Sequence, residues 1–344
     1  MKFRSLFILL ISVTLILAPA AGLRFSSNAE EGEPSSSEPT TTSATKTTEK
    51  SAQEPTVAIP TTTENSGGYK VKLLRRDSGK VEDIPLEEYV VGALAAEMPA
   101  SWHAEALKAQ ATACRTFAVY SRGRAGTSLN GADMSDFAGS HQGYLDEGQR
   151  KAKWGESFDK NEKLCRDAVK STAGKILRYK DNVAFTAFHA ISSGVTESAK
   201  NVWGNDLAYL RPVNSAGDAL SPNYALSVAV PLSEFHEKLG VLDCKITDGK
   251  ISIGKITLTE SGYVEQIVLG GKEIRGIKLR EVFALPSAAF TLTVTDGGAV
   301  FECRGLGHGV GMSQFGAQTM AQQGSSWQDI LGHYYGGQLT LGDV

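Results

Sequence analysis

The chain has 344 residues, of which 41% are hydrophobic and 21% are charged, so it is long enough to bury one large core or two ordinary ones. Its formal net charge of -3 argues against a general nucleic-acid-binding protein, which would carry a basic excess on one face. The composition therefore predicts a folded protein without a nucleic-acid partner.

The first 25 residues have the pattern of an export signal or a membrane anchor. Lys2 and Arg4 precede an apolar run from Leu6 to Leu17, and small residues follow at positions 18 to 22. Cleavage after the small residues and retention in the bilayer both fit this pattern, and we favour an uncleaved anchor. The basic flank predicts a single-pass protein of the cell membrane, with its folded region on the extracytoplasmic side.

Residues 26 to 67 are dominated by Ser, Thr, Glu and Pro. They contain too few apolar side chains to offset the entropy of ordering, which predicts a disordered linker. The folded region is then expected at 68 to 344, and it opens with a strand pattern from Tyr69.

A helical hairpin is predicted from Pro85 onward. The first helix is expected to end at Met98, just before Pro99, and its apolar stripe occupies positions 86, 89, 90, 93 and 94. Glu97 takes the next position on that stripe. Burial, apolar neighbours and the negative end of the helix dipole would each favour its protonated form, which is the form a general acid needs. A Glu side chain that turns out to solvent at a frayed helix end is the alternative.

The second helix of the hairpin is predicted over Trp102 to Arg122, with Ser101 as its N-cap. Gln110 and Arg115 lie at the border of its apolar stripe. They either face the same groove as Glu97 or belong to a solvated helix flank.

Further along, a helix is predicted at Glu162 to Thr172, followed by strands at Ile176 to Tyr179 and Ala184 to His189. Ser192 and Ser193 follow the second strand. They either bind a polar ligand or form an ordinary turn, because their spacing does not match the nucleophile elbow of a serine hydrolase.

From residue 224 to 304 the sequence predicts a β-rich subdomain, with short strands separated by Asp-Gly, Ser-Gly and Gly-Gly turns and a short helix at Ile277 to Phe283. The predicted fold class is therefore α+β. A helical hairpin and a Gly-rich C-terminal helical segment are expected to form a catalytic groove, with the β-rich subdomain beside them.

The C-terminal segment has glycine at positions 305, 307, 309 and 311, so one face of an extended backbone carries no side chains. Either another backbone or a ligand must approach that face. A dinucleotide is excluded because no acidic residue follows at the expected distance. A helix capped by Ser313 and closed at Gly324 is predicted next, and then a helix at Ser326 to Tyr335.

The chain has four cysteines, and none has the spacing of a structural zinc site. A disulfide is permitted outside the cell. Because Cys244 and Cys303 flank the β-rich segment, they are the predicted pair.

Several sequence motifs occur in a characteristic order, namely Glu97-Met98-Pro99-Ala100-Ser101, Glu105 to Ala111, Arg115-Thr116, Phe188-His189, Val202-Trp203-Gly204 and Gly307 to Gln314. Together they resemble the SpoIID family of stage II sporulation proteins, over roughly residues 69 to 344. The resemblance implies a lytic transglycosylase of the membrane that cleaves the MurNAc-GlcNAc bond of peptidoglycan. It would leave 1,6-anhydroMurNAc ends during engulfment in sporulation, on strands already stripped of stem peptides.

The resemblance also implies roles for individual residues. Glu97 matches the family's catalytic acid and Arg115 its supporting arginine, while Tyr209 and Arg211 match a substrate-binding stretch. The spacing of cysteine and histidine, which departs from the family's pattern, supports no metal site in this chain, and no cofactor is expected. Further candidates for contact with the glycan are Gln110, Ser192, Ser193, His308 and Gln314. The stretch from Ser192 to Thr196 keeps only part of the family's pattern.

One carboxylate suffices for such a reaction, whereas ordinary glycoside hydrolysis uses two. Glu97 would protonate the glycosidic oxygen and then accept the proton of the sugar's own 6-hydroxyl. The implied partners are peptidoglycan glycan strands, an amidase like SpoIIP and a membrane scaffold like SpoIIM. Two alternatives stay open, namely an amidase enhancer without glycan cleavage and a peptidoglycan-binding module.

Overall fold

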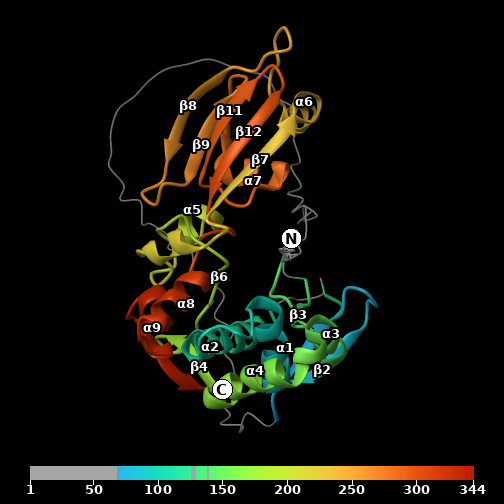
Figure 1. Cartoon of the computed structure of the whole chain (residues 1–344), viewed down its shortest axis with the longest axis vertical. Helices are drawn as coiled ribbons and strands as arrows, with labels where there is room; N and C mark the ends of the chain where they lie inside the picture. Colours follow the sequence, from blue (N-terminus) through green and yellow to red (C-terminus); the bar gives the residue numbers. More distant parts are fainter. Residues whose placement is uncertain (1–67, 125–128, 138) are drawn as a thin grey trace, which may run out of the picture. The chain divides into compact units, whose positions relative to one another are not determined.

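The structure is a computed structural model that describes residues 68–124, 129–137 and 139–344. The predicted anchor and the predicted linker lie outside the described residues. Within the described residues, no helix is both long enough and apolar enough to cross a membrane. The fold is mixed α+β, as predicted (Figure 1).

The helical hairpin consists of α1 (Leu86–Glu97) and α2 (Ala104–Ser121). Pro85 and Met98 flank α1, which confirms its predicted ends. The prediction that Ser101 caps α2 is wrong. The cap is His103, whose ring accepts a hydrogen bond from the N–H of Glu105 at 3.3 Å, so the helix starts two residues later.

Strands and helices on either side of the hairpin complete its core. The strand predicted from Tyr69 is β1 (Lys70–Leu74), which pairs antiparallel with β2 (Val81–Pro85) and parallel with β3 (Met134–Ser135). Two further helices, α3 (Glu147–Trp154) and α4 (Phe158–Ser171), contact α1. The start of α4 precedes the predicted Glu162, because a short 3-10 turn over Gly155–Ser157 runs directly into the helix.

A small antiparallel sheet holds the C-terminus of the chain. Its central strand is β4 (Lys175–Tyr179), which lies between β5 (Asn182–Val183) and β14 (Leu339–Asp343). The strand predicted at Ala184 to His189 is shorter than expected, because only β6 (Phe188–His189) pairs. β6 runs parallel to β13 (Met312–Ser313) and thus joins two motifs that are far apart in the sequence.

The Gly-rich run is packed against other segments of the chain, against backbone at Gly305 and Gly311 and against side chains at Gly307 and Gly309. All four glycines have positive φ. A Cβ atom at Gly311 would lie 2.0 Å from the carbonyl oxygen of Ala187, and one at Gly307 would lie 2.8 Å from the Cβ of His189. The first predicted alternative, the approach of another backbone, is therefore found at Gly305 and Gly311, whereas the Tyr263 ring fills the space at Gly309.

The β-rich region has its own core, in which Phe235, Phe283 and Phe301 are buried. Its two sheets have the strand orders β11-β12-β7 and β10-β9-β8. Helix α7 confirms the short helix predicted there, whereas α6 was not predicted. The elements are β7 (Ala225–Pro231), α6 (Leu232–Val241), β8 (Ile253–Leu258), β9 (Val264–Leu269), β10 (Lys272–Arg275), α7 (Gly276–Phe283), β11 (Phe290–Thr295) and β12 (Gly298–Arg304).

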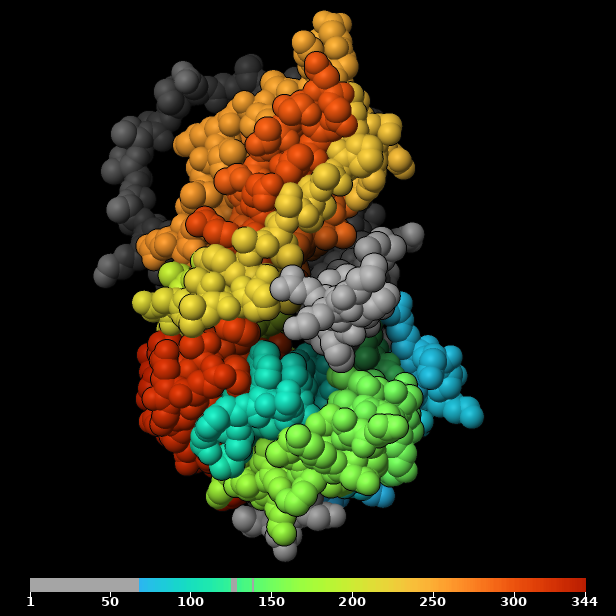
Figure 2. Space-filling model, viewed as in Figure 1, coloured from blue at the N-terminus to red at the C-terminus, as the bar shows by residue number. Residues whose placement is uncertain are grey.

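The C-terminal helices return to the hairpin. Both α8 (Gln314–Gln322) and α9 (Trp327–Tyr334) contact α2, and in Figure 2 these red segments lie against the teal hairpin helix. Ser313 caps α8 as predicted, with its hydroxyl accepting a hydrogen bond from the N–H of Gly316. The connection between β6 and the β-rich region contains α5 (Ala199–Trp203) and a 3-10 helix at Ala216–Leu220.

Candidate active site

Glu97 is the last residue of α1, and its side chain is half-buried. The loop after β3 returns to this carboxyl, and the N–H of Gly143 donates to Oε1 of Glu97 at 2.5 Å. The loop lies this close because Gly92 has no side chain, and a Cβ there would come within 2.3 Å of the Tyr144 ring. Tyr144 stacks on Tyr89, with ring centroids 5.5 Å apart. The helix and the loop together fix the position of the acid.

Burial raises the pKa of the Glu97 carboxyl above its ordinary value. The N–H of Gly143, the side chain of Gln314 and the charge of Lys153 each act in the opposite direction, but burial dominates. Lys153 is held at the end of α1, where its Nζ donates to the carbonyl oxygen of Ala95 at 2.8 Å. Within the described part of the chain, Lys153 is the one charged group that shifts this pKa, so no second carboxylate acts on Glu97.

Two buried glutamine amides meet at Cys114, and a third acts on the Glu97 carboxyl. Gln142 Nε2 donates to the hydroxyl of Tyr89 at 2.9 Å and to the carbonyl oxygen of Cys114 at 3.1 Å. Gln110 Nε2 donates to the sulfur of Cys114 at 3.3 Å. Gln314, the first residue of α8, lies close enough to lower the pKa of the acid.

Each of these amides has one polar atom without a hydrogen-bond partner among the described residues, namely Oε1 of Gln110, Oε1 of Gln142 and Nε2 of Gln314. An unpaired buried polar atom costs about 1 to 3 kcal/mol. These atoms have almost no exposed surface, so a ligand with hydroxyl and amide groups would satisfy two acceptors and one donor here once neighbouring side chains shift. Gln142 was not predicted from the sequence. The signal that could have found it is Gly92, because a glycine inside a helix indicates that another segment packs closely against it, and here that segment is the loop with Gln142.

The contacts of Arg115 hold helices together. Its side chain is fully buried and forms a two-pronged ion pair with Glu87, at 2.9 and 2.7 Å. The remaining donors bind the hydroxyl of Thr172 and the carbonyl oxygens of Val169 and Lys175. No hydrogen bond or ion pair joins it to the acid within the described ranges. Arg115 therefore ties α1, α2 and α4 together.

The two serines after β6 also have structural partners. Ser192 is buried, and its hydroxyl and N–H both donate to the carboxylate of Asp218, at 2.5 and 2.8 Å. Ser313 donates to the other oxygen of Asp218 at 2.7 Å. Ser193 contacts the β-rich region, because its N–H donates to the hydroxyl of Tyr263 at 3.2 Å. Both positions thus fix the turn and do not reach Glu97.

The remaining candidates are dispersed. Tyr209 is buried, and its hydroxyl accepts a hydrogen bond from the N–H of Phe185 at 2.9 Å. Arg211 is exposed and forms an ion pair with Asp206 at 2.5 Å. The structure brings Gln314 to the Glu97 carboxyl and leaves these two elsewhere.

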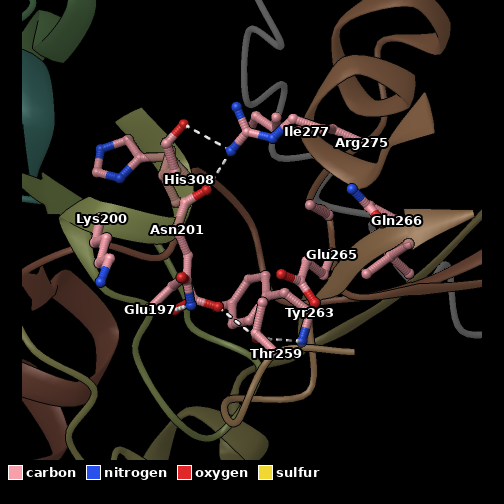
Figure 3. A pocket seen from close by; sticks show the side chains of 13 residues that line it. Glu197, Lys200, Asn201, Thr259, Tyr263, Glu265, Gln266, Arg275, Ile277 and His308 are labelled. Atoms are coloured by element: carbon pink, nitrogen blue, oxygen red, sulfur yellow. Dashed lines mark hydrogen bonds between the residues drawn. The ribbon is translucent and has the colours of Figure 1, made fainter. Parts of the chain in front are cut away.

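His308 faces a different part of the molecule. Its ring lies 5.0 Å from the Trp203 ring and 5.7 Å from the His189 ring, measured between centroids. It lines a cavity of about 220 Å³ at the junction of α5 and the β-rich region (Figure 3). Burial holds the pKa of His308 well below its ordinary value, so the imidazole is neutral at neutral pH.

The cysteines correct one prediction. Cys244 and Cys303 are buried free thiols, as are Cys114 and Cys165. Burial raises the pKa of Cys303 to about 11, so a thiolate does not form readily there. Among the described residues, no group of three or more His, Cys, Asp and Glu side chains is arranged to hold a metal ion.

These features define a mixed α+β protein in which one partly buried carboxyl, raised in pKa, stands at the end of the first hairpin helix. Comparison with known proteins places it among its relatives. A family model described as "Stage II sporulation protein", SpoIID, matches residues 75–179. The chain is 40% identical to stage II sporulation protein D of Bacillus amyloliquefaciens over 275 residues, which cover 78% of this chain and 77% of that protein.

The chain is also 37% identical to stage II sporulation protein D of Bacillus subtilis (strain 168) over 347 residues, covering 98% of this chain and 94% of the relative. The chain therefore belongs to the SpoIID family of stage II sporulation proteins. A more distant relative is the amidase enhancer of Bacillus subtilis (strain 168), at 25% identity over 297 residues, covering 72% of this chain and 39% of that protein.

Proposed function

We propose that this protein is a lytic transglycosylase that cleaves peptidoglycan glycan strands and uses Glu97 as its single acid and base. The observation that carries the proposal is the environment of Glu97. Burial favours the protonated carboxyl, and no second carboxylate among the described residues shifts its pKa. A hydrolase with two carboxylates would place them about 5 to 9.5 Å apart, where each would act on the other.

The reaction follows from this arrangement. Protonated Glu97 donates its proton to the glycosidic oxygen between MurNAc and GlcNAc, so the bond breaks and positive charge develops at C1 of the MurNAc ring. The resulting carboxylate then takes the proton from the 6-hydroxyl of that ring as the oxygen attacks C1. The 1,6-anhydro ring closes, Glu97 is protonated again, and no water is consumed.

The neighbouring groups have matching tasks in this proposal. The N–H of Gly143 stabilises the carboxylate formed after the first proton transfer, because it already donates to Oε1. The unpaired atoms of Gln110, Gln142 and Gln314 would bind hydroxyl and N-acetyl groups of the glycan. Arg115 acts as a positioning residue, since its pairing with Glu87 fixes the helix that carries the acid.

The wider setting is part of the same proposal. The family's role in sporulation, together with the apolar N-terminal segment, supports a membrane-anchored enzyme with an extracytoplasmic catalytic region that acts during engulfment. Strands without stem peptides are the proposed substrate. An amidase that removes those peptides, like SpoIIP, and a membrane scaffold, like SpoIIM, are the proposed partners.

A second function is favoured by the relative named as an amidase enhancer. In that case the protein would bind the cell wall or a hydrolase without cutting glycan. Cleavage in water enriched in heavy oxygen separates the possibilities. A lytic transglycosylase gives anhydro ends without label, a hydrolase gives reducing ends that carry the label, and an enhancer gives no new ends. The last two outcomes would each overturn our proposal.

A further inference from the structure

The cavity beside His308 is built from polar side chains of two separate regions. Figure 3 shows His308, Lys200 and Asn201 along one side, Arg275, Glu265 and Gln266 along the other, and Tyr263 with Thr259 between them. Its volume of about 220 Å³ is below the range of about 300 to 1,000 Å³ that is typical of pockets for drug-sized ligands. A ligand group about as large as one sugar ring is therefore the best match in size.

The walls of this cavity are fixed by contacts across it. The carboxylate of Glu197 accepts from the hydroxyl of Thr259 at 2.5 Å and from Nδ2 of Asn201 at 2.9 Å. Arg275 donates to the carbonyl oxygens of Asn201 and Val202, at the end of α5. The cavity is thus a preformed feature of the junction.

The charges that line the cavity cancel. Lys200 and Arg275 are opposed by Glu197 and Glu265, and His308 is neutral because burial lowers its pKa. An anion or a cation would meet an equal number of repelling charges here. A neutral ligand with many hydroxyl and amide groups would find both donors and acceptors.

An exposed aromatic ring stands next to this polar cavity. Trp203 is 40% exposed, although it is a large aromatic side chain, and its ring packs against His308 in the cavity wall. An apolar ring face beside convergent polar groups suits the apolar faces of a sugar ring, whose hydroxyl groups point outward.

A row of aromatic rings connects the cavity with the loop that holds the acid. The centroid distances between neighbours are 5.0, 5.7, 5.8 and 6.4 Å along the series His308, Trp203, Phe185, Phe117 and His141. His141 lies two residues before Gly143, the donor to Glu97. These rings come from segments that are far apart in the sequence, yet each of them is at least partly exposed.

From this arrangement we propose that the cavity beside Trp203 and His308 is a second saccharide-binding site, which holds one neutral sugar ring of the glycan strand while Glu97 acts on a bond further along. This proposal rests on the proposed function for the identity of the strand. One ligand can bridge the cavity and the region of Glu97. His308 lines the cavity and Gln314 acts on the Glu97 carboxyl, and because they are six residues apart in the sequence, their Cα atoms are at most about 20 Å apart. A strand of a few sugars would cover that span.

Binding is tested with the full-length protein carrying Glu97→Gln, so that no cleavage occurs. The probes are glycan strands without stem peptides and a tetramer of N-acetylglucosamine. Their binding is measured by the change in tryptophan fluorescence and by calorimetry. We expect Trp203→Ala and Gln266→Ala each to weaken strand binding about tenfold, which corresponds to about 1.4 kcal/mol. Trp203→Phe should retain binding, because it keeps an aromatic ring. The matched control is Leu341→Ala, a change at a similarly exposed apolar residue of β14 (43% exposed).

Equal affinity of Trp203→Ala, Gln266→Ala and Leu341→Ala would overturn the second site. With Glu97 present, Trp203→Ala should raise KM for long strands and leave kcat and the pH profile unchanged. The binding experiment does not depend on whether the protein cleaves glycan, because it uses the Glu97→Gln variant. Failure of the cleavage proposal can therefore be distinguished from failure of the second site. If strands bind through Trp203 but no anhydro ends ever form, the second site stands and the transglycosylase assignment falls.

Discussion

The ion pair between Arg115 and Glu87 gives a prediction that separates a structural role from a catalytic one. Replacing Arg115 by Met removes the guanidinium, so the Glu87 carboxylate keeps only the N–H of Gly174 as a donor, and the oxygens of residues 169, 172 and 175 each lose a hydrogen bond. Breaking a buried ion pair in this way costs about 3 to 5 kcal/mol. Arg115 is 0% exposed but Glu87 is 28% exposed, so water reaches one partner. We therefore expect a loss at the lower end, about 3 kcal/mol.

The assay is urea unfolding of the purified protein. Glu88→Gln is the control on the neighbouring residue, because Glu88 pairs with Arg166 on the surface, where side chains are 49% and 41% exposed. Such a surface pair should contribute no more than about 1 kcal/mol. The double variant Arg115→Met/Glu87→Leu should recover much of the lost stability, since no buried charge is left unpaired.

A direct catalytic role would give a different pattern. The structural account would be refuted if Arg115→Met unfolded at the wild-type urea concentration and yet lost glycan cleavage more than about a hundredfold. It also requires that cleavage by Arg115→Met, measured well below its unfolding transition, stays within about tenfold of the wild type.

Three further predictions concern the Gly-rich run, the acid and the thiols. Gly311→Ala should destabilise the protein by more than about 3 kcal/mol, because its Cβ would strike the carbonyl oxygen of Ala187 at 2.0 Å. Gly336→Ala, also at positive φ but with open space around it, should cost only about 1 kcal/mol, and equal losses in thermal unfolding would contradict this account. Burial raises the pKa of Glu97, so the carboxyl destabilises the fold as pH rises through its folded pKa. Glu97→Gln should therefore have the higher Tm at pH 8, and the difference should vanish below about pH 4, the ordinary range of Glu; a constant difference across pH would be inconsistent with burial of the carboxyl. Finally, the unreduced protein should react with four equivalents of a thiol reagent after unfolding and with almost none before, because all four cysteines are buried free thiols; recovery of only two equivalents would restore the disulfide.

Much of the hairpin could be predicted from local signals. Pro85 and Pro99 delimit the first helix, and the helical period places Glu97 on its apolar stripe, so both the partial burial of Glu97 and its raised pKa follow from spacing. The β-rich region and the N-cap at Ser313 could also be predicted from the sequence, because turn dipeptides and N-cap residues act locally.

Long-range pairing was not accessible from the same signals. An arginine at the border of an apolar helix stripe can face a groove or pair with a carboxylate on another helix. The sequence did not show that Arg115 would form an ion pair with Glu87. Likewise, the sequence did not show that the hydroxyl of Ser192 would donate a hydrogen bond to Asp218, which lies 26 residues later in a 3-10 helix. The four alternating glycines predicted a close approach, but only the tertiary fold shows that Ala187 and His189 make it.

In the proposed reaction, Glu97 alone carries the proton in both steps. The most direct measurement compares wild-type protein with Glu97→Gln on purified glycan strands without stem peptides, and counts anhydro-ended products by mass spectrometry. The amide keeps the hydrogen-bond acceptor for Gly143 but holds no transferable proton. We therefore predict that the wild type forms anhydro ends and that a correctly folded Glu97→Gln forms them at least about a thousandfold more slowly. Equal amounts of anhydro ends from the two proteins would contradict the account.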